Sequence, residues 1–142
     1  MVIDRNIIPY CVERIFADRN ELQRESCWVI CNAICGGNPN QILAILNTTD
    51  SIAAICKLLR NGEDKRLLNI IIESLDRCVI LGDILQNQQQ ADNNAVKVLL
   101  DECGCLDALE NLTITDDELY ELVDSFIAKN FGYDDDEYVA HS

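Results

Sequence analysis

Apolar residues recur at intervals of three and four along almost the whole chain, and no segment alternates apolar and polar positions convincingly. This spacing places the apolar side chains on one face of a helix. Glycines, prolines and short polar runs interrupt the pattern. The helices predicted between these breaks cover residues 7–17, 19–35, 39–48, 50–61, 63–86, 94–103, 105–112 and 116–131. The sequence therefore predicts an all-α protein of short helices joined by tight turns.

The predicted helices repeat with an offset of 44 residues, because "NIIPYCV" at 6–12 aligns with "DSIAAIC" at 50–56. An offset in the forties with three helices per unit is typical of armadillo or HEAT repeats. We therefore predict an armadillo-type right-handed α-solenoid of about three repeats. Its expected parts are a partial first repeat at 1–36, a second repeat with a long third helix at 37–90, a C-terminal repeat at 91–132 and an acidic disordered tail at 133–142.

The start of the chain lacks the first helix of a repeat, because residues 1–6 are too few to form one. We interpret the chain as a fragment of a longer array. The alternative is a native protein whose first repeat is reduced.

The single tryptophan lies on the polar side of its own predicted helix. With Trp28 at zero and 100° per residue, Asn32 and Glu25 fall at about 40° and 60°. An indole ring attracts a cation and covers the methylene stem of a lysine or arginine. An asparagine amide both donates to and accepts from a peptide backbone. These three side chains are a candidate binding surface, and the alternative is that Trp28 packs against the next repeat.

The formal charge of −14 is concentrated near the C-terminus, where residues 103–142 hold eleven acids and one lysine. This charge argues against nucleic acid or an anionic membrane as a partner and favours a basic one. A solvated acidic surface is the alternative for the tail. No apolar run reaches the roughly 18 residues of a membrane span, and no secretion signal opens the chain. We therefore expect an intracellular protein.

The eight cysteines lie within apolar helical patterns, so we interpret them as reduced, buried thiols. Cys27, Cys31 and Cys35 extend over about 12 Å of helix and cannot bind one metal ion. The single histidine, His141, is the penultimate residue, and no phosphate-binding motif follows the Gly36-Gly37 pair. A metal or thiol enzyme is the alternative from another class. We predict that the chain is not an enzyme and holds no metal or cofactor.

Three stretches resemble the last three armadillo repeats of the importin-α family. They are "ESCWVICNAICGGNPNQI" at 25–42, "IIESLDRCVILGD" at 71–83 and "GCLDALENLTITDDELYELVDSFIAKNF" at 104–131. The resemblance implies a nuclear transport adaptor that shuttles between cytoplasm and nucleus and binds basic nuclear-localisation-signal peptides. It implies that Trp28 stacks on a cargo side chain, Asn32 bonds the peptide backbone and Glu25 faces a cationic group.

The resemblance has departures that limit the expected binding. At the offset of 44, Ile72 and Asp76 replace Trp28 and Asn32, so only the edge of the family's minor cargo groove is present. One stacking position contributes about 1–2 kcal/mol, against about 8 kcal/mol for micromolar affinity. We therefore expect the chain alone to bind signal peptides weakly.

The last repeat, by the same resemblance, belongs to the surface held by the export receptor with its GTPase. The acids that suit a basic partner there are Asp116, Asp117, Glu118, Glu121 and Asp124. Importin-β is an expected partner only if a basic segment lies upstream. The alternative function is an armadillo scaffold that binds another basic partner or only the export receptor.

Overall fold

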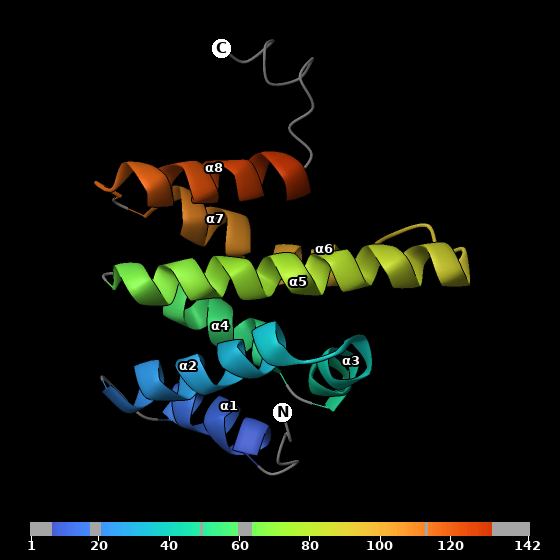
Figure 1. Cartoon of the computed structure of the whole chain (residues 1–142), viewed down its shortest axis with the longest axis horizontal. Helices are drawn as coiled ribbons and strands as arrows, with labels where there is room; N and C mark the ends of the chain where they lie inside the picture. Colours follow the sequence, from blue (N-terminus) through green and yellow to red (C-terminus); the bar gives the residue numbers. More distant parts are fainter. Residues whose placement is uncertain (1–6, 18–20, 49, 60–63, 113, 132–142) are drawn as a thin grey trace.

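The computed structural model describes residues 7–17, 21–48, 50–59, 64–112 and 114–131, which form eight helices (Figure 1). The helices are α1 (Ile7–Ala17), α2 (Glu21–Gly36), α3 (Pro39–Thr48), α4 (Ser51–Leu59), α5 (Lys65–Gln89), α6 (Ala95–Glu102), α7 (Cys105–Glu110) and α8 (Asp117–Asn130). Each corresponds to one predicted helix, with ends that differ by three residues at most. The predicted all-α class is therefore confirmed. The predicted tail at 133–142 and His141 lie outside the described residues.

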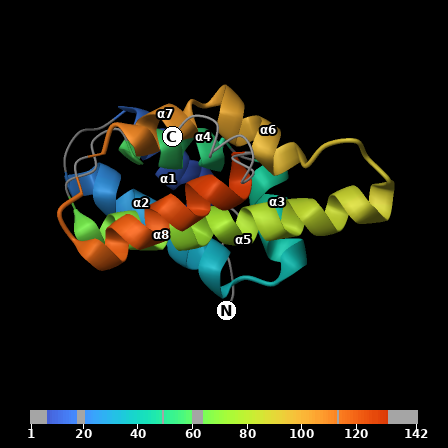
Figure 2. The same cartoon turned by 90° about the horizontal axis from the view of Figure 1, so that it is seen from above.

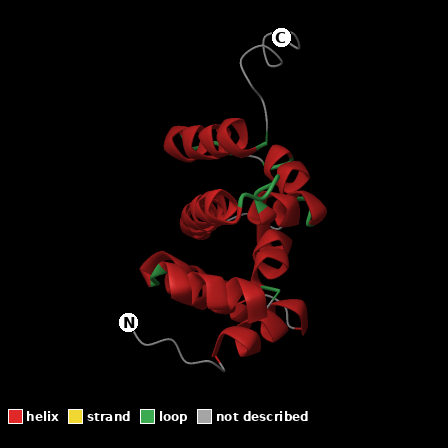
Figure 3. Ribbon diagram, turned by 90° about the vertical axis from the view of Figure 1, so that its right-hand side faces the viewer, coloured by secondary structure: helices red, strands yellow, loops and turns green. Residues whose placement is uncertain are grey.

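The helices form two layers. In one layer α2, α5 and α8 lie side by side, and in the other α1, α4 and α7 follow the same order (Figures 1 and 3). In the view from above, α6 and α7 lie along one side of the pair α5 and α8 (Figure 2). This arrangement is consistent with an α-solenoid. The number of repeats, the right-handed sense and the boundaries after residues 36 and 90 stay predictions.

Helix α4 lies at the centre of the core, and seven of its nine residues are buried. It packs against α1, α2, α5, α6 and α7, which explains why its sequence is almost wholly apolar. Among the described helices, none is by itself long and apolar enough to cross a membrane. Only α3 and α4 together meet that test of length and composition, and they are bent by 84° at their junction.

A close contact between α5 and α6 fixes the start of α6. The buried Asn94 caps α6, because its Oδ1 accepts hydrogen bonds from the N–H groups of Val96 and Lys97 at 2.9 and 3.2 Å. Its Nδ2 donates to the Val79 carbonyl of α5 at 3.0 Å. The α5 residue beneath Asn94 is Gly82, where a Cβ would lie 2.1 Å from the Asn94 Oδ1. Because glycine has no Cβ, Gly82 lets the Asn94 side chain lie this close to α5.

Two ion pairs join α5 to α8. The Lys65 Nζ lies 2.7 Å from Asp116 Oδ2, just before α8, and the Lys129 Nζ lies 3.0 Å from Asp76 Oδ1. Between the ion pairs, α8 contacts the core through an apolar stripe. In that stripe Leu119, Val123 and Phe126 are buried, and Leu122 and Ile127 are partly buried. The ion pairs and the apolar stripe together fix the position of α8 on α5.

Candidate functional site

The outward face of the layer formed by α2, α5 and α8 carries the predicted binding residues. Glu25 and Asn32 of α2 are exposed on this face, and Trp28 between them is partly buried against the core. The three side chains thus form one stripe along the helix, as their spacing of three and four residues requires.

The partial burial of Trp28 has a simple geometric cause. Trp28 precedes Cys35 by seven residues, or about two turns, so both side chains lie on the same side of α2. The Cys35 Sγ lies 3.4 Å from the Ser74 Oγ of α5, which shows that this side faces α5. Trp28 therefore lies at the edge between the helix interface and the outward face. One part of the ring packs inward, and the remainder is accessible.

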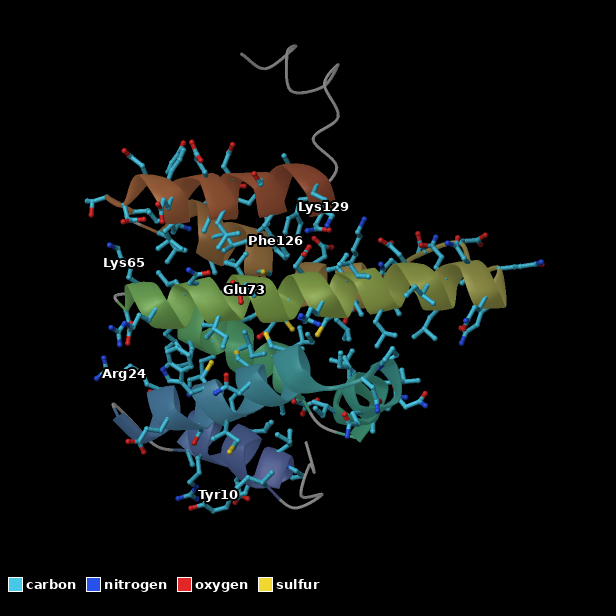
Figure 4. The ribbon with its side chains drawn as sticks, viewed as in Figure 1. Tyr10, Arg24, Lys65, Glu73, Phe126 and Lys129 are labelled. Atoms are coloured by element: carbon cyan, nitrogen blue, oxygen red, sulfur yellow. The ribbon has the colours of Figure 1, made fainter. Side chains whose placement is uncertain are left out.

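On α5, the positions equivalent to Trp28 and Asn32 are not the ones that the offset of 44 predicted. Ile72 is only 1% exposed, and Asp76 bonds Lys129 of α8, so neither takes the place of Trp28 or Asn32. The exposed residues here are Glu73 and Arg77, at an offset of 45 rather than 44. Figure 4 shows Glu73 on the outward face of α5. The prediction for Ile72 and Asp76 was wrong because Ile72 is buried in the core and Asp76 is paired with Lys129 of α8.

An open groove of about 630 Å³ continues from Glu73 and Arg77 along α5. The turn between α2 and α3 forms one wall, and α5 forms the other. Its lining residues are Gly37, Pro39, Ile42, Glu73, Asp76, Arg77, Ile80, Leu81 and Ile84. The groove therefore combines an apolar floor with charged groups at one end.

The acidic residues predicted on α8 divide into two groups. Asp117, Glu118, Glu121 and Asp124 are exposed on the helix. Asp116 instead caps α8 by accepting a hydrogen bond from the Leu119 N–H at 2.9 Å, and it pairs with Lys65. The Lys65 ammonium and this N–H lower the pKa of Asp116. Asp116 thus has a structural role in positioning α8.

The cysteines behave as small apolar residues in the core. Six are buried, and Cys35 and Cys103 are partly buried. Burial raises the pKa of Cys78 to about 12. The pKa of Cys27 is raised by its contact with Cys31, whose sulfur lies 3.9 Å away, and by burial. The thiols of Cys27 and Cys78 therefore stay protonated at neutral pH and are poor nucleophiles.

The chain was compared with known proteins. No family model matches it. Over 117 residues, or 82% of the chain, it is 31% identical to importin subunit alpha-5 of Arabidopsis thaliana. This supports an armadillo-type protein. The chain spans 22% of the length of this relative, about a fifth.

Sequence reasoning missed the residues that α5 adds to the outward face. Glu73 and Arg77 could have been found by testing an offset of 45, which also aligns most apolar positions with apolar ones. The groove itself had no such signal, because its two walls come from segments separated by more than thirty residues.

Proposed function

We propose that this chain is part of an importin-α-like nuclear transport adaptor. In this proposal, the stripe of Glu25, Trp28 and Asn32 forms the edge of the minor groove for basic nuclear-localisation-signal peptides. The observation that carries the proposal is the placement of an accessible indole edge between an exposed carboxylate and an exposed carboxamide. The similarity to an importin subunit alpha supports it.

Each side chain of the stripe has a distinct task in this proposal. The accessible part of Trp28 covers the methylene stem of a lysine or arginine and attracts its cationic group. The amide of Asn32 satisfies one donor and one acceptor of the extended peptide backbone. Glu25 stabilises the cationic end of the bound side chain. Since one such position contributes only about 1–2 kcal/mol, the chain alone binds these peptides weakly.

The second part of the proposal concerns α8. Its exposed acids Asp117, Glu118, Glu121 and Asp124 present a negative surface suited to the export receptor, which acts with its GTPase. Asp116 contributes to this surface indirectly by fixing the start of the helix. An adaptor that meets both partners shuttles between the cytoplasm and the nucleus.

A peptide titration tests the cargo role. A labelled lysine-rich signal peptide is titrated with the full chain, and binding is followed by fluorescence anisotropy. We expect Asn32→Ala to weaken binding about fivefold, which corresponds to the loss of about one hydrogen bond to the backbone. The matched control is Asn93→Ala, since Asn93 is an exposed asparagine outside the stripe. Equal weakening by both variants, or by neither, would reject the cargo role.

A pull-down separates this function from the alternative scaffold role. If the chain captures the export receptor with its GTPase bound to GTP but shows no peptide binding that depends on Asn32, it serves the export receptor only.

A further inference from the structure

The groove along α5 differs chemically from the stripe on α2. We infer that it is a subsite for an aliphatic side chain of the bound peptide, and that Arg77 keeps it from favouring a second basic side chain. This inference rests on the proposed function, because it assigns a residue of the same peptide that is bound at Trp28.

The apolar part of the groove lies on the outward face of α5 and is accessible. Ile80 and Ile84 lie about one turn apart on α5, and each is 44% exposed. Pro39 and Ile42 line the opposite wall. An aliphatic side chain placed between these walls would remove apolar surface from water on both sides.

The wall opposite α5 is held in place before any ligand binds. Asn38 and Gln41 bond each other reciprocally at the start of α3, with both N–H to side-chain oxygen distances at 2.9 Å. This is the pattern of a capping box, with Pro39 at the first helical position. Because this wall is already fixed, binding loses less conformational entropy.

The charged end of the groove places Arg77 beside two carboxylates, Glu73 and Asp76. Among the described residues, the Glu73 and Arg77 side chains have no hydrogen bond or ion pair, and Asp76 is already paired with Lys129. Arg77 occupies the position that Asn32 holds on α2 at the offset of 45. The Arg77 guanidinium offsets the charge of Glu73 one turn before it, so the groove offers a peptide lysine no net attraction, whereas its apolar walls favour an aliphatic side chain. Glu73 and Arg77 remain available for the polar groups of the peptide backbone.

The distance between the two subsites sets the spacing within the peptide. Packed helices lie about 8–10 Å apart, and Gly37, where the wall of the groove begins, follows Trp28 by nine residues, or about 13 Å of helix. The two subsites are thus about 16 Å apart, which an extended peptide covers in about five residues at about 3.3 Å per residue. The groove therefore favours a basic residue and an aliphatic residue about five positions apart.

Peptides with a single variable position test this inference on the full chain. Each carries a basic cluster and, five residues beyond it, leucine, lysine or serine, and the series is made with the variable residue on either side of the cluster. In one of the two directions we expect leucine to bind about five- to tenfold more tightly than serine, as burial of an aliphatic side chain predicts. Lysine should bind no better than serine.

Variants of exposed residues assign the preference to the groove. Ile84→Ser should remove the advantage of leucine and leave the serine peptide unchanged. Arg77→Asn should improve binding of the lysine peptide, while Arg66→Asn, which removes the same charge from an exposed site in the first turn of α5, should not.

Three results would overturn the inference. If the basic cluster binds and depends on Asn32, but leucine gives no advantage in either direction, the groove is not a subsite and the proposed function stands. If no peptide binds, both fail. If the chain forms a concentration-dependent dimer in sedimentation and Ile84→Ser makes it monomeric, the groove binds a second copy of the chain instead.

Discussion

The contact between Gly82 and Asn94 leads to a prediction about stability whose sign depends on the background. Alanine is normally favoured over glycine in a helix by about 1 kcal/mol. At residue 82, however, the three atoms nearest to an added Cβ all belong to the Asn94 side chain, at 2.1, 2.7 and 2.8 Å. The Asn94 side chain would have to move.

The cost of moving Asn94 follows from its hydrogen bonds. The side chain is 5% exposed, caps α6 at the Val96 and Lys97 N–H groups, and donates to Val79. Loss of the cap costs about 1 kcal/mol and loss of the buried hydrogen bond about as much, so Asn94→Ala should destabilise the fold by about 2 kcal/mol.

Gly82→Ala should therefore lower the free energy of unfolding by about 1 kcal/mol in the native chain, because the loss of about 2 kcal/mol exceeds the gain in helix propensity. In the Asn94→Ala background the obstructing atoms are absent, so the same substitution should raise the free energy of unfolding by up to about 1 kcal/mol.

Urea unfolding of the four proteins, followed by circular dichroism, measures this difference. The urea dependence should stay equal across the set, so that shifts in the midpoint report stability. The coupling between the two substitutions should be about 2 kcal/mol. Equal effects of Gly82→Ala in both backgrounds would refute the packing argument for this glycine.

Two further predictions concern polar contacts that join distant helices. The Lys57 ammonium of α4 donates to the Ile15 carbonyl at the end of α1 at 3.0 Å, so Lys57→Met should lower the free energy of unfolding by about 1–2 kcal/mol in thermal or urea melts. An unchanged melt would show that this cap is dispensable. Since Lys65 lowers the pKa of Asp116, the stabilisation from ionised Asp116 should be complete above the usual Asp pKa of about 3.9 and disappear as the pH falls through its lower folded-state value. The free energies of the native chain and Asp116→Asn should therefore differ at pH 7 and converge in strong acid, and a difference that stays constant with pH would contradict this role of the ionised carboxylate.

The helices were predictable from the sequence because local chemistry determines them. Apolar spacing specifies the buried face of each, and residues such as Asp64, Asn94 and Asp116 stand at helix starts, where their side chains accept backbone N–H groups. Gln90 shows a limit of this approach. Its backbone adopts a left-handed conformation (φ 53°) after α5, which extends to Gln89, three residues beyond its predicted end.

The candidate site was only partly predictable, because its geometry depends on contacts between repeats. The spacing of Glu25, Trp28 and Asn32 correctly placed them in one stripe, but the partial burial of Trp28 comes from α5. The apolar pattern of α5 fits an offset of 44 or 45, and only the packing of Ile72 shows that 44 is wrong there. A sequence pattern cannot resolve one residue of offset when both choices keep the core apolar.

The most direct test of the proposed function uses the single tryptophan as its reporter. In an isotope-labelled sample of the full chain, the Trp28 indole N–H gives one side-chain signal in a nuclear magnetic resonance spectrum, and titration with a lysine-rich signal peptide to millimolar concentration detects even weak binding. If Trp28 contacts the peptide, this signal should shift saturably, and the shift should require a higher peptide concentration in Asn32→Ala than in Asn93→Ala. An indole signal that stays in place while backbone signals elsewhere report bound peptide would contradict the assignment of this face as the cargo site.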